Sequence, residues 1–371
     1  MKQVNGHEII QLFERFSPKG YAMEGDKVGL QVGRLNRKVE RVMIALDVLE
    51  EVVDEAIEKN VQLIIAHHPI IYRPLQKIST DTLPGRIFEK LIKNDISVYA
   101  AHTNLDIAKG GVNDMLASAL GLENAEVLAP TVEEKLKKIV VYVPEENAEE
   151  VRKALGKAGA GAIGNYSDCS FSSAGEGRFL PGDNTDPYIG EQGVLETVNE
   201  VRIETIVPEA LIKKAVSAML KVHPYEEAVF DIYPVENQGE VLGLGRIGQV
   251  QEMTLAEFTE KVKTALNVDK VRVVGDLNAK VRKVAVLGGD GNKYWSQAKF
   301  KGADVYVTGD IYYHTAHDAM MQGLNMIDPG HNVEKVMKKG VAEILTKNCV
   351  EAGYQVTIFP SEADTNPFKY L

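Results

Sequence analysis

The chain has 371 residues, enough for two or three domains with a sizeable core. Its 42 Lys and Arg against 53 Asp and Glu give a net charge of −11, which argues against nonspecific nucleic-acid binding, because that binding needs cations to neutralise phosphates. Two cysteines leave no disulfide framework and are typical of a reducing cytosol. Neither a signal peptide nor an apolar run of the ~18–20 residues of a membrane span is visible, so we expect a cytoplasmic protein without nucleic-acid or membrane partners.

The first part of the chain, residues 1–129, alternates predicted helices and strands. The predicted helices are 5–16, 50–59, 83–93 and 112–120. The predicted strands are 39–48, 61–69 and 96–106. Nearly all-apolar strands that alternate with helices indicate a parallel sheet covered on both faces. We interpret this part as the first α/β half of a main domain.

The pattern changes over residues 130–240. A strand at 137–144 and an Ala- and Glu-rich helix at 146–160 precede a polar, Gly- and Ser-rich stretch with two strand pieces and a long excursion at 175–193. A strand at 198–208, a helix at 209–224 and a strand at 228–235 follow. The order β-α-β-β-α-β predicts an inserted ferredoxin-like α+β domain.

The alternation resumes over residues 241–371, the second half of the main domain. Thr254 and Glu257 form a predicted capping box that opens a helix. The predicted helices are 254–267, 291–302, 313–323 and 332–348. The predicted strands are 270–275, 283–289, 303–310, 324–330 and 354–360.

The two halves resemble each other in layout. Asp47 ends one predicted strand and His67 ends the next, 20 residues on. Asp290 follows one strand and Asp310 ends the next, also 20 residues on. We interpret the main domain as a diverged duplication, which predicts a pseudo-twofold site between the halves.

Histidines and carboxylates collect where the predicted strands end, which is where open α/β sheets bind ligands. The set that we single out is His67, His68, Asp106, His331 and Glu334. Mixed nitrogen and oxygen donors suit Zn, Mn, Fe, Co or Ni better than Ca or Mg. Five ligands exceed the three protein ligands of one catalytic zinc, so two metal ions fit the count better.

Ordinary structural roles compete with this hypothesis. A lone His-His pair is usually unremarkable, Asp106 could cap a helix, and Glu334 could be a first-turn carboxylate favoured by the helix dipole. The metal hypothesis depends on all five residues meeting at the strand ends. His102, Asp310, His314 and His317 could equally contact substrate, support the ligands or lie on a solvated helix face.

Two other classes of site are not supported. "GLGRIG" (243–248) matches the dinucleotide pattern G-x-G-x-x-G, but no helix opens directly after it, so we interpret it as a glycine-marked strand. The chain has no G-x-S-x-G nucleophile elbow.

Longer motifs carry a family resemblance. They are "DKVGLQVG" (26–33), "IIAHHPIIYRPL" (64–75), "YAAHTNLDIAKGGVND" (99–114), "TGDIYYHTAHDA" (308–319) and "DPGHNVEK" (328–335). Together they resemble the GTP cyclohydrolase I type 2 homologue family, also called NGG-interacting-factor-three-like, across the whole chain. "KVHPYEEAVFDIYPV" (221–235) looks like the PII/CutA-like insert of the family's long bacterial form.

The resemblance implies a dinuclear metal site made of the same five residues, with Glu334 as the bridging ligand. Many members space the last pair H-x-x-x-E, whereas His331 and Glu334 here form H-x-x-E, with Lys335 at the next position. The resemblance also implies a homohexameric ring.

We therefore expect a metal-dependent hydrolase, GTP cyclohydrolase-like, that uses two divalent ions, most readily Zn, and a metal-activated water on a nucleotide-like or other small substrate. His314 and His102 are the predicted catalytic residues, and Asp310, Thr103 and Asn104 the predicted substrate contacts. The alternative is a non-enzymatic metal-binding regulator or chaperone with a small-molecule-sensing insert.

Overall fold

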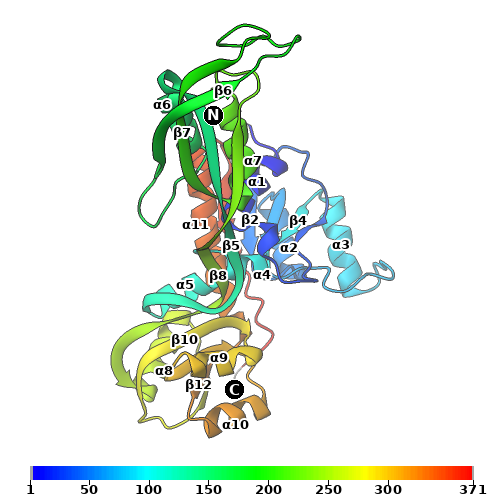
Figure 1. Ribbon diagram of the computed structural model, residues 1–371. Coiled ribbons are helices and arrows are strands. Elements are labelled where there is room, and N and C mark those ends of the chain that lie inside the picture. The colour runs from blue at the N-terminus through cyan, green and yellow to red at the C-terminus, as the bar shows by residue number, and fades with distance from the viewer. Residues whose placement is uncertain (1–2, 370–371) are drawn as a thin grey trace. The chain divides into compact units, whose positions relative to one another are not determined.

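The computed structural model describes residues 3–369, which form two compact units (Figure 1). The larger unit combines Met1–Val132 with Leu242–Leu371, and the smaller unit is Glu133–Val241. The sequence predicted an insert of residues 130–240. Among the helices of residues 3–369, none has the length and apolar character needed to cross a membrane.

The first sheet of the larger unit has the strand order β1-β4-β3-β2-β13. Its strands are β1 (Gly29–Val32), β2 (Arg41–Ala45), β3 (Leu63–Ala66), β4 (Ser97–Ala100) and β13 (Thr357–Pro360). All neighbours are parallel except β1, which pairs antiparallel with β4. The helical segments of this part are α1 (Gly6–Phe16), η1 (Lys19–Tyr21), α2 (Glu50–Glu58), α3 (Leu83–Lys93), α4 (Thr103–Ile107) and α5 (Val112–Ala119).

The second sheet contributes the strand order β8-β10-β11-β12-β9 to the larger unit. These strands are β8 (Phe230–Thr254), β9 (Arg272–Val274), β10 (Lys280–Asp290), β11 (Val305–Gly309) and β12 (Asn325–Asp328). β10, β11 and β12 are parallel, and β8 and β9 flank them antiparallel. The helical segments are α8 (Leu255–Leu266), η4 (Asn292–Tyr294), α9 (Trp295–Phe300), α10 (Tyr313–Met321), η5 (His331–Lys335) and α11 (Val336–Glu351).

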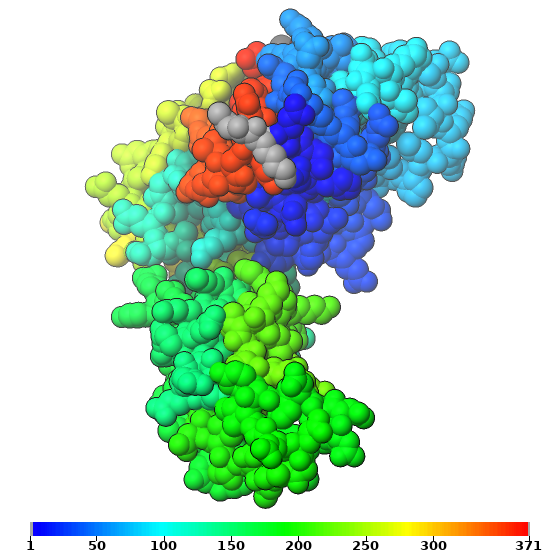
Figure 2. Space-filling model, turned by 90° about the horizontal axis from the view of Figure 1, so that it is seen from above, coloured from blue at the N-terminus to red at the C-terminus, as the bar shows by residue number. Residues whose placement is uncertain are grey.

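The apolar residues of alternate strand positions form a layered core. On one face of each sheet, residues such as Ile65 and Val307 pack in a shared cluster with helices α1, α5, α8 and α11. The opposite face of the first sheet packs on α2 and α3, and that of the second on α9 and α10. Figure 2 shows the N-terminal residues, in blue, beside the C-terminal helix, in orange-red. Both faces of each sheet are therefore covered, as predicted.

Several local predictions are confirmed and others are wrong. Thr254 and Glu257 form the predicted capping box at α8. The sheets are mixed rather than wholly parallel, because antiparallel strands join their edges. The sequence missed β1, which is too short for a period to register. The predicted strand that ends at Asp106 is too long. The backbone turns at His102, whose carbonyl oxygen accepts the N–H groups of Leu105 and Asp106, and α4 begins there.

The smaller unit is a sheet of order β6-β7-β5-β8 with two helices. Its strands are the later part of β5 (Glu123–Pro144), β6 (Phe171–Phe179), β7 (Glu196–Pro208) and the first part of β8. Its helical segments are η2 (Glu145–Asn147), α6 (Ala148–Lys157), η3 (Glu209–Leu211) and α7 (Ile212–Leu220). β5 starts 14 residues before the predicted strand, because its charged first part hides the apolar pattern. Val141 and Ile203 are among the sheet residues packed against α6 and α7, so the helices cover one face.

Candidate metal centre

Segments far apart in the chain bring five histidines and carboxylates together in the larger unit. His67 and His68 follow β3, and Asp106 lies in α4. His331 and Glu334 lie in η5, which leads from β12 into α11. The sites at the carboxyl ends of both parallel strand groups thus converge on one place.

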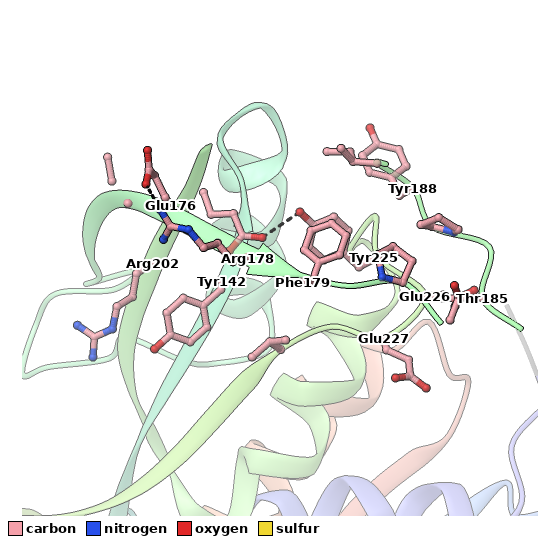
Figure 3. A pocket seen from close by; sticks show the side chains of 18 of the residues that line it. Tyr142, Glu176, Arg178, Phe179, Thr185, Tyr188, Arg202, Tyr225, Glu226 and Glu227 are labelled. Carbon is pink, nitrogen blue, oxygen red and sulfur yellow. Dashed lines mark hydrogen bonds and ion pairs between the residues drawn. The ribbon is translucent and has the colours of Figure 1, made fainter. Parts of the chain in front are cut away.

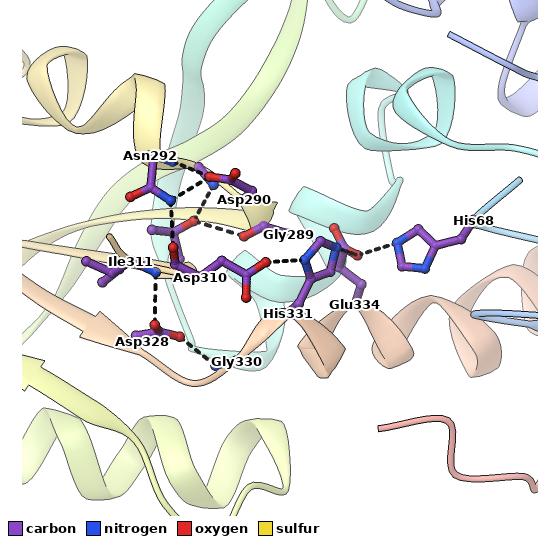
Figure 4. A network of polar contacts seen from close by, with 12 residues as sticks. His68, Gly289, Asp290, Asn292, Asp310, Ile311, Asp328, Gly330, His331 and Glu334 are labelled. Atoms are coloured by element: carbon purple, nitrogen blue, oxygen red, sulfur yellow. Dashed lines mark hydrogen bonds and ion pairs between the residues drawn. The ribbon is translucent and has the colours of Figure 1, made fainter. Parts of the chain in front are cut away.

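Glu334 lies in the middle, and its two carboxylate oxygens face different partners. Oε1 lies 3.8 Å from Nε2 of His67. Oε2 lies 3.1 Å from Nε2 of His68 and 3.3 Å from Nε2 of His331, and Figure 4 shows Glu334 between these two rings. Oδ1 of Asp106 lies 3.7 Å from Nε2 of His67, on the Oε1 side. The two oxygens of this carboxylate therefore face different donors, with His67 and Asp106 on one side and His68 and His331 on the other.

The outer nitrogens of the three histidines all have acceptors. Nδ1 of His68 lies 2.7 Å from Asp47 Oδ1, and Nδ1 of His331 lies 2.6 Å from Asp310 Oδ2. Nδ1 of His67 lies 2.9 Å from the Ala101 carbonyl oxygen. With the proton on Nδ1, each ring turns the lone pair of Nε2 towards Glu334, which is the tautomer that binds a metal ion.

His102 adds a fourth ring to the cluster. Its centroid lies 5.3 Å from that of His67 and 5.7 Å from that of His68, and the three can offer nitrogen atoms to one ion. Nδ1 of His102 lies 2.8 Å from Asp26 Oδ1. Hydrogen bonds from His102 and Thr103 lower the pKa of Asp26, although burial opposes the shift. Sequence reasoning gave no role to Asp26, which lies in the short "GDKVG" segment without a strand or helix pattern.

Two buried polar atoms at the centre, Nε2 of His67 and Oδ1 of Asp106, have no hydrogen-bond partner within residues 3–369. His67 is fully buried, so neither atom can turn to bulk water. Leaving a buried polar atom unsatisfied costs about 1–3 kcal/mol. Donor atoms bound to one ion at roughly 2.0–2.2 Å lie about 3–4 Å apart, the spacing found here. These residues fit a metal ion.

The pKa shifts of the clustered residues also favour a bound metal ion. Burial would raise the pKa of Glu334, but the charge of His67 and hydrogen bonds from the histidines hold it well below its usual range. Burial, with a smaller contribution from Glu334, raises the pKa of Asp106 to about 6. Burial would lower the pKa of His68, but Asp47 and Glu334 raise it to about 10. Two buried carboxylates thus attract positive charge, which metal ions can supply.

Of the predicted substrate contacts, Thr103 and Asn104 have partners inside the protein. The Thr103 hydroxyl donates to Asp26 and accepts the N–H of Met23 at 2.9 Å. The buried Asn104 amide donates to Ser17 Oγ at 2.9 Å, whereas its Oδ1 has no partner. Asp310 holds His331, as described above. These contacts position the polypeptide around the centre, and substrate binding by the three residues stays a prediction.

His314, the other predicted catalytic residue, lies exposed at the start of α10. Its ring contact is with Tyr313, at 5.4 Å between centroids, and none of the possible ligand groups in residues 3–369 includes it. His317, also exposed, packs on the same tyrosine. The structure therefore brings His102 to the centre but leaves His314 apart from it.

A polar network holds the segment that carries His331 (Figure 4). Asp328 accepts the N–H groups of Ile311 at 3.0 Å and Gly330 at 2.8 Å, and Asn292 donates to the Asp310 carbonyl oxygen at 2.8 Å. Gly289, in the glycine-rich segment "GGDGNK" (288–293), also shapes the centre. Its φ is +63°, and a Cβ there would lie 2.7 Å from Glu334 Oε1, so only glycine leaves room for the carboxylate. In the sequence, Gly288 and Gly289 together at the end of a predicted strand indicate that another group lies close to the backbone there.

Comparisons with known proteins agree on one family. The family model for Duf34/NIF3 (NGG1p interacting factor 3) matches residues 4–367. A Bacillus subtilis protein named GTP cyclohydrolase 1 type 2 homolog is 62% identical over 371 residues, with all of both chains covered. A crystal structure of a Bacillus cereus protein related to NIF3 has 62% identity and a TM-score of 0.96, and Staphylococcus aureus protein SA1388 has 34% identity and a TM-score of 0.78, each with full coverage of both chains.

Proposed function

The chain belongs to the Duf34/NIF3 (NGG1p interacting factor 3) family, and from this premise we propose that its histidine–carboxylate cluster is a dinuclear metal centre of a hydrolase acting on a nucleotide-like or other small substrate. The observation that carries the proposal is the division of partners at Glu334, whose two oxygens face two separate groups of donors. A bridging carboxylate is the ligand that two neighbouring ions share in hydrolytic sites.

Each position would have its own ligands. The first would use His67, Asp106 and Oε1 of Glu334, and the second His68, His331 and Oε2 of Glu334. The imidazole and carboxylate donors suit Zn most readily and also Mn, Fe, Co or Ni. Bound divalent ions supply Lewis acidity that polarises a substrate and activates water.

The chain's own residues would orient the ligands and handle protons. Asp47 and Asp310 hold the rings of His68 and His331 in the ligating tautomer. His102 is the candidate for proton transfer, because its side chain is 26% exposed, next to the buried His67, and its Nδ1 is held by Asp26. His314 would take part only if a bound substrate reaches α10.

The test is metal content and turnover of matched variants. Wild type purified without added metal should hold two divalent ions per chain by mass spectrometry of metals. It should also hydrolyse at least one member of a panel of nucleotides, including GTP, and phosphoesters. His67→Ala and His331→Ala should lower turnover by roughly 100-fold or more with an unchanged circular dichroism spectrum. His317→Ala, an exposed histidine outside the cluster, is the control.

Fully metallated wild type without turnover on the whole panel would contradict the hydrolase and favour the non-enzymatic regulator or chaperone. Variants that lose assembly or thermal stability while the metallated wild type has no turnover would favour a structural metal.

We propose further that the protein is a homo-oligomer, a hexameric ring as its family resemblance implies. Light scattering coupled to size-exclusion chromatography tests this by the number of chains per particle.

We also infer that the larger unit is a duplication and the smaller an inserted ferredoxin-like domain. Each half has an aspartate that contacts a histidine 21 residues further on, near strand ends: Asp47 with His68, and Asp310 with His331. This correspondence supports the duplication, in place of the predicted match of Asp47 and His67 with Asp290 and Asp310. The element order of residues 133–241 and the sheet order β6-β7-β5-β8 support the ferredoxin-like assignment.

A further inference from the structure

The smaller unit has a cavity of about 600 Å³ that no step at the metal centre uses (Figure 3). All of its lining residues belong to residues 133–241. Its volume lies in the range of small-molecule sites, roughly 300–1,000 Å³. The cavity is therefore large enough for a ligand of its own.

The floor of the cavity is the sheet face that α6 and α7 leave uncovered. Tyr142 pairs with Arg202, and Gly175 pairs with Glu200, across neighbouring strands. Side chains alternate between the faces of a strand, so Tyr142, Glu200 and Arg202 point away from the core residues Val141 and Ile203. The polar floor is thus set by the strand register.

Two glycines of β6 leave space above this face of the sheet. A Cβ at Gly175 would meet no atom within 4 Å, so the space above this residue is open. A Cβ at Gly177 would lie 2.2 Å from Oε2 of Glu200, so glycine there leaves room for the carboxylate. Glycine is normally disfavoured inside strands and often marks close approach of another group.

Aromatic rings form the wall. Phe179 and Tyr225 meet edge to face with centroids 5.7 Å apart, and Tyr188 lies 6.3 Å from Tyr225. The Tyr225 hydroxyl donates to Glu200 Oε1 at 2.9 Å. His223 supports Tyr225 from behind, since its Nδ1 accepts the Tyr225 N–H at 3.2 Å and its Nε2 donates to the Tyr142 carbonyl oxygen at 2.9 Å. The wall is held in place from two sides.

The charges of the lining favour a cationic ligand. Four carboxylates and two guanidiniums line the cavity, Glu176, Glu200, Glu226, Glu227, Arg178 and Arg202. Both guanidiniums already have carboxylate partners, because Arg178 pairs with Glu176 and Arg202 pairs with Glu204. An anion such as a phosphate would have to break one of these pairs.

A metal ion is a poorer occupant. Within residues 3–369, the groups of three or more donors close enough for one ion all lie at the centre of the larger unit. Aromatic faces beside carboxylates instead suit an organic cation, which gains cation–π attraction of about 0.5–2 kcal/mol per ring contact.

We propose that this cavity binds a small organic cation, an amine with a flat aromatic or apolar body. The body packs between Phe179, Tyr188 and Tyr225, and the ammonium group lies near Glu200, whose Oε1 accepts the Tyr225 hydroxyl. Glu227 adds a further exposed carboxylate to the lining.

The test compares two probes of similar shape and opposite charge, tyramine and 4-hydroxyphenylacetate, on the full chain by calorimetry and saturation-transfer NMR. Tyramine should bind at least roughly tenfold more tightly than the anion. Gly175→Val should weaken tyramine binding by roughly tenfold or more, because it fills open space without a clash and valine favours strands. Glu200→Gln, which can still accept from Tyr225, should weaken it through loss of charge.

Phe171→Ala is the matched control. Phe171 lies on β6, as Gly175 does, but it is 67% exposed and does not line the cavity. The affinity of the Phe171→Ala variant for tyramine should stay within about twofold of that of wild type. Equal binding of the two probes, preference for the anion, no binding of tyramine to wild type, or full affinity in a folded Gly175→Val variant would each overturn the proposal. None of these outcomes depends on the metal centre.

Discussion

The two sides of the Glu334 carboxylate differ in how the protein holds the facing histidines. On the Oε1 side, His67 is fully buried and its Nδ1 is held by a backbone carbonyl. On the Oε2 side, the His68 and His331 side chains are 24% and 37% exposed and each is held by an aspartate. The Oε1 side is thus more enclosed, whereas the Oε2 side is more open and carries more negative charge.

This difference assigns different roles to the two sides. A backbone carbonyl cannot rotate away as a side chain can, so the His67 ring should keep its orientation when no ion is bound. The Oε2 side depends on aspartate side chains and faces solvent, so substrate and exchanging ions should reach it first. We expect an ion on the Oε1 side to leave more slowly during dialysis against a chelator.

The largest effect is expected at the shared carboxylate. Glu334→Gln keeps the shape of the side chain but removes the charge from both sides, so metal content should fall from two ions per chain to fewer than one. Metal mass spectrometry of the purified variant measures this. Glu343→Gln, an exposed glutamate on α11, is the control and should retain two ions. Two ions in Glu334→Gln would contradict a bridging role.

Single histidine removals should separate the sides. His67→Ala should empty the Oε1 side and His331→Ala the Oε2 side, with one ion retained in each, because the remaining ligands on the other side are intact. Anomalous diffraction from crystals of each variant would locate the ion that stays. Loss of both ions from either variant would mean that the two positions fill as one unit.

Changes to the aspartates should affect mainly the Oε2 side. Asp47→Asn and Asp310→Asn weaken the acceptors that hold His68 and His331, and such changes typically cost 10–100-fold in metal affinity. Competition with a chromophoric chelator measures the affinity of each ion. Asp95→Asn, which alters a surface ion pair with Arg34, should leave both affinities unchanged. An equal loss on both sides would remove the distinction between them.

A smaller effect is expected from Thr365, whose hydroxyl donates to Oδ2 of Asp47. Thr365→Ala removes one hydrogen bond, worth about 0.5–1.5 kcal/mol, so affinity on the Oε2 side should fall by no more than roughly tenfold. The same chelator competition detects this. Thr264→Ala, which removes a hydroxyl from the exposed face of α8, provides the comparison. A greater loss than in Asp47→Asn would show that Thr365 acts by another route.

Most of the secondary structure could be predicted from the sequence alone, and so could the cluster of five residues centred on Glu334. Local patterns suffice for these, because apolar spacing reports burial within one element and polar residues at the ends of parallel strands meet at one sheet edge. Long motifs also identified the family, which the comparisons confirm.

Which atoms face each other depends on contacts between segments far apart in the chain. His68 and Glu334 are 266 residues apart. The difference between Oε1 and Oε2 arises because His67 and Asp106 lie on one side of the carboxylate and His68 and His331 on the other. The roles of Asp26 and Gly289 arise in the same way, because no local period marks a residue that supports a distant side chain. The cavity in the smaller unit depends on strand register, and a shift of one residue would turn Tyr142 and Glu200 to the opposite face.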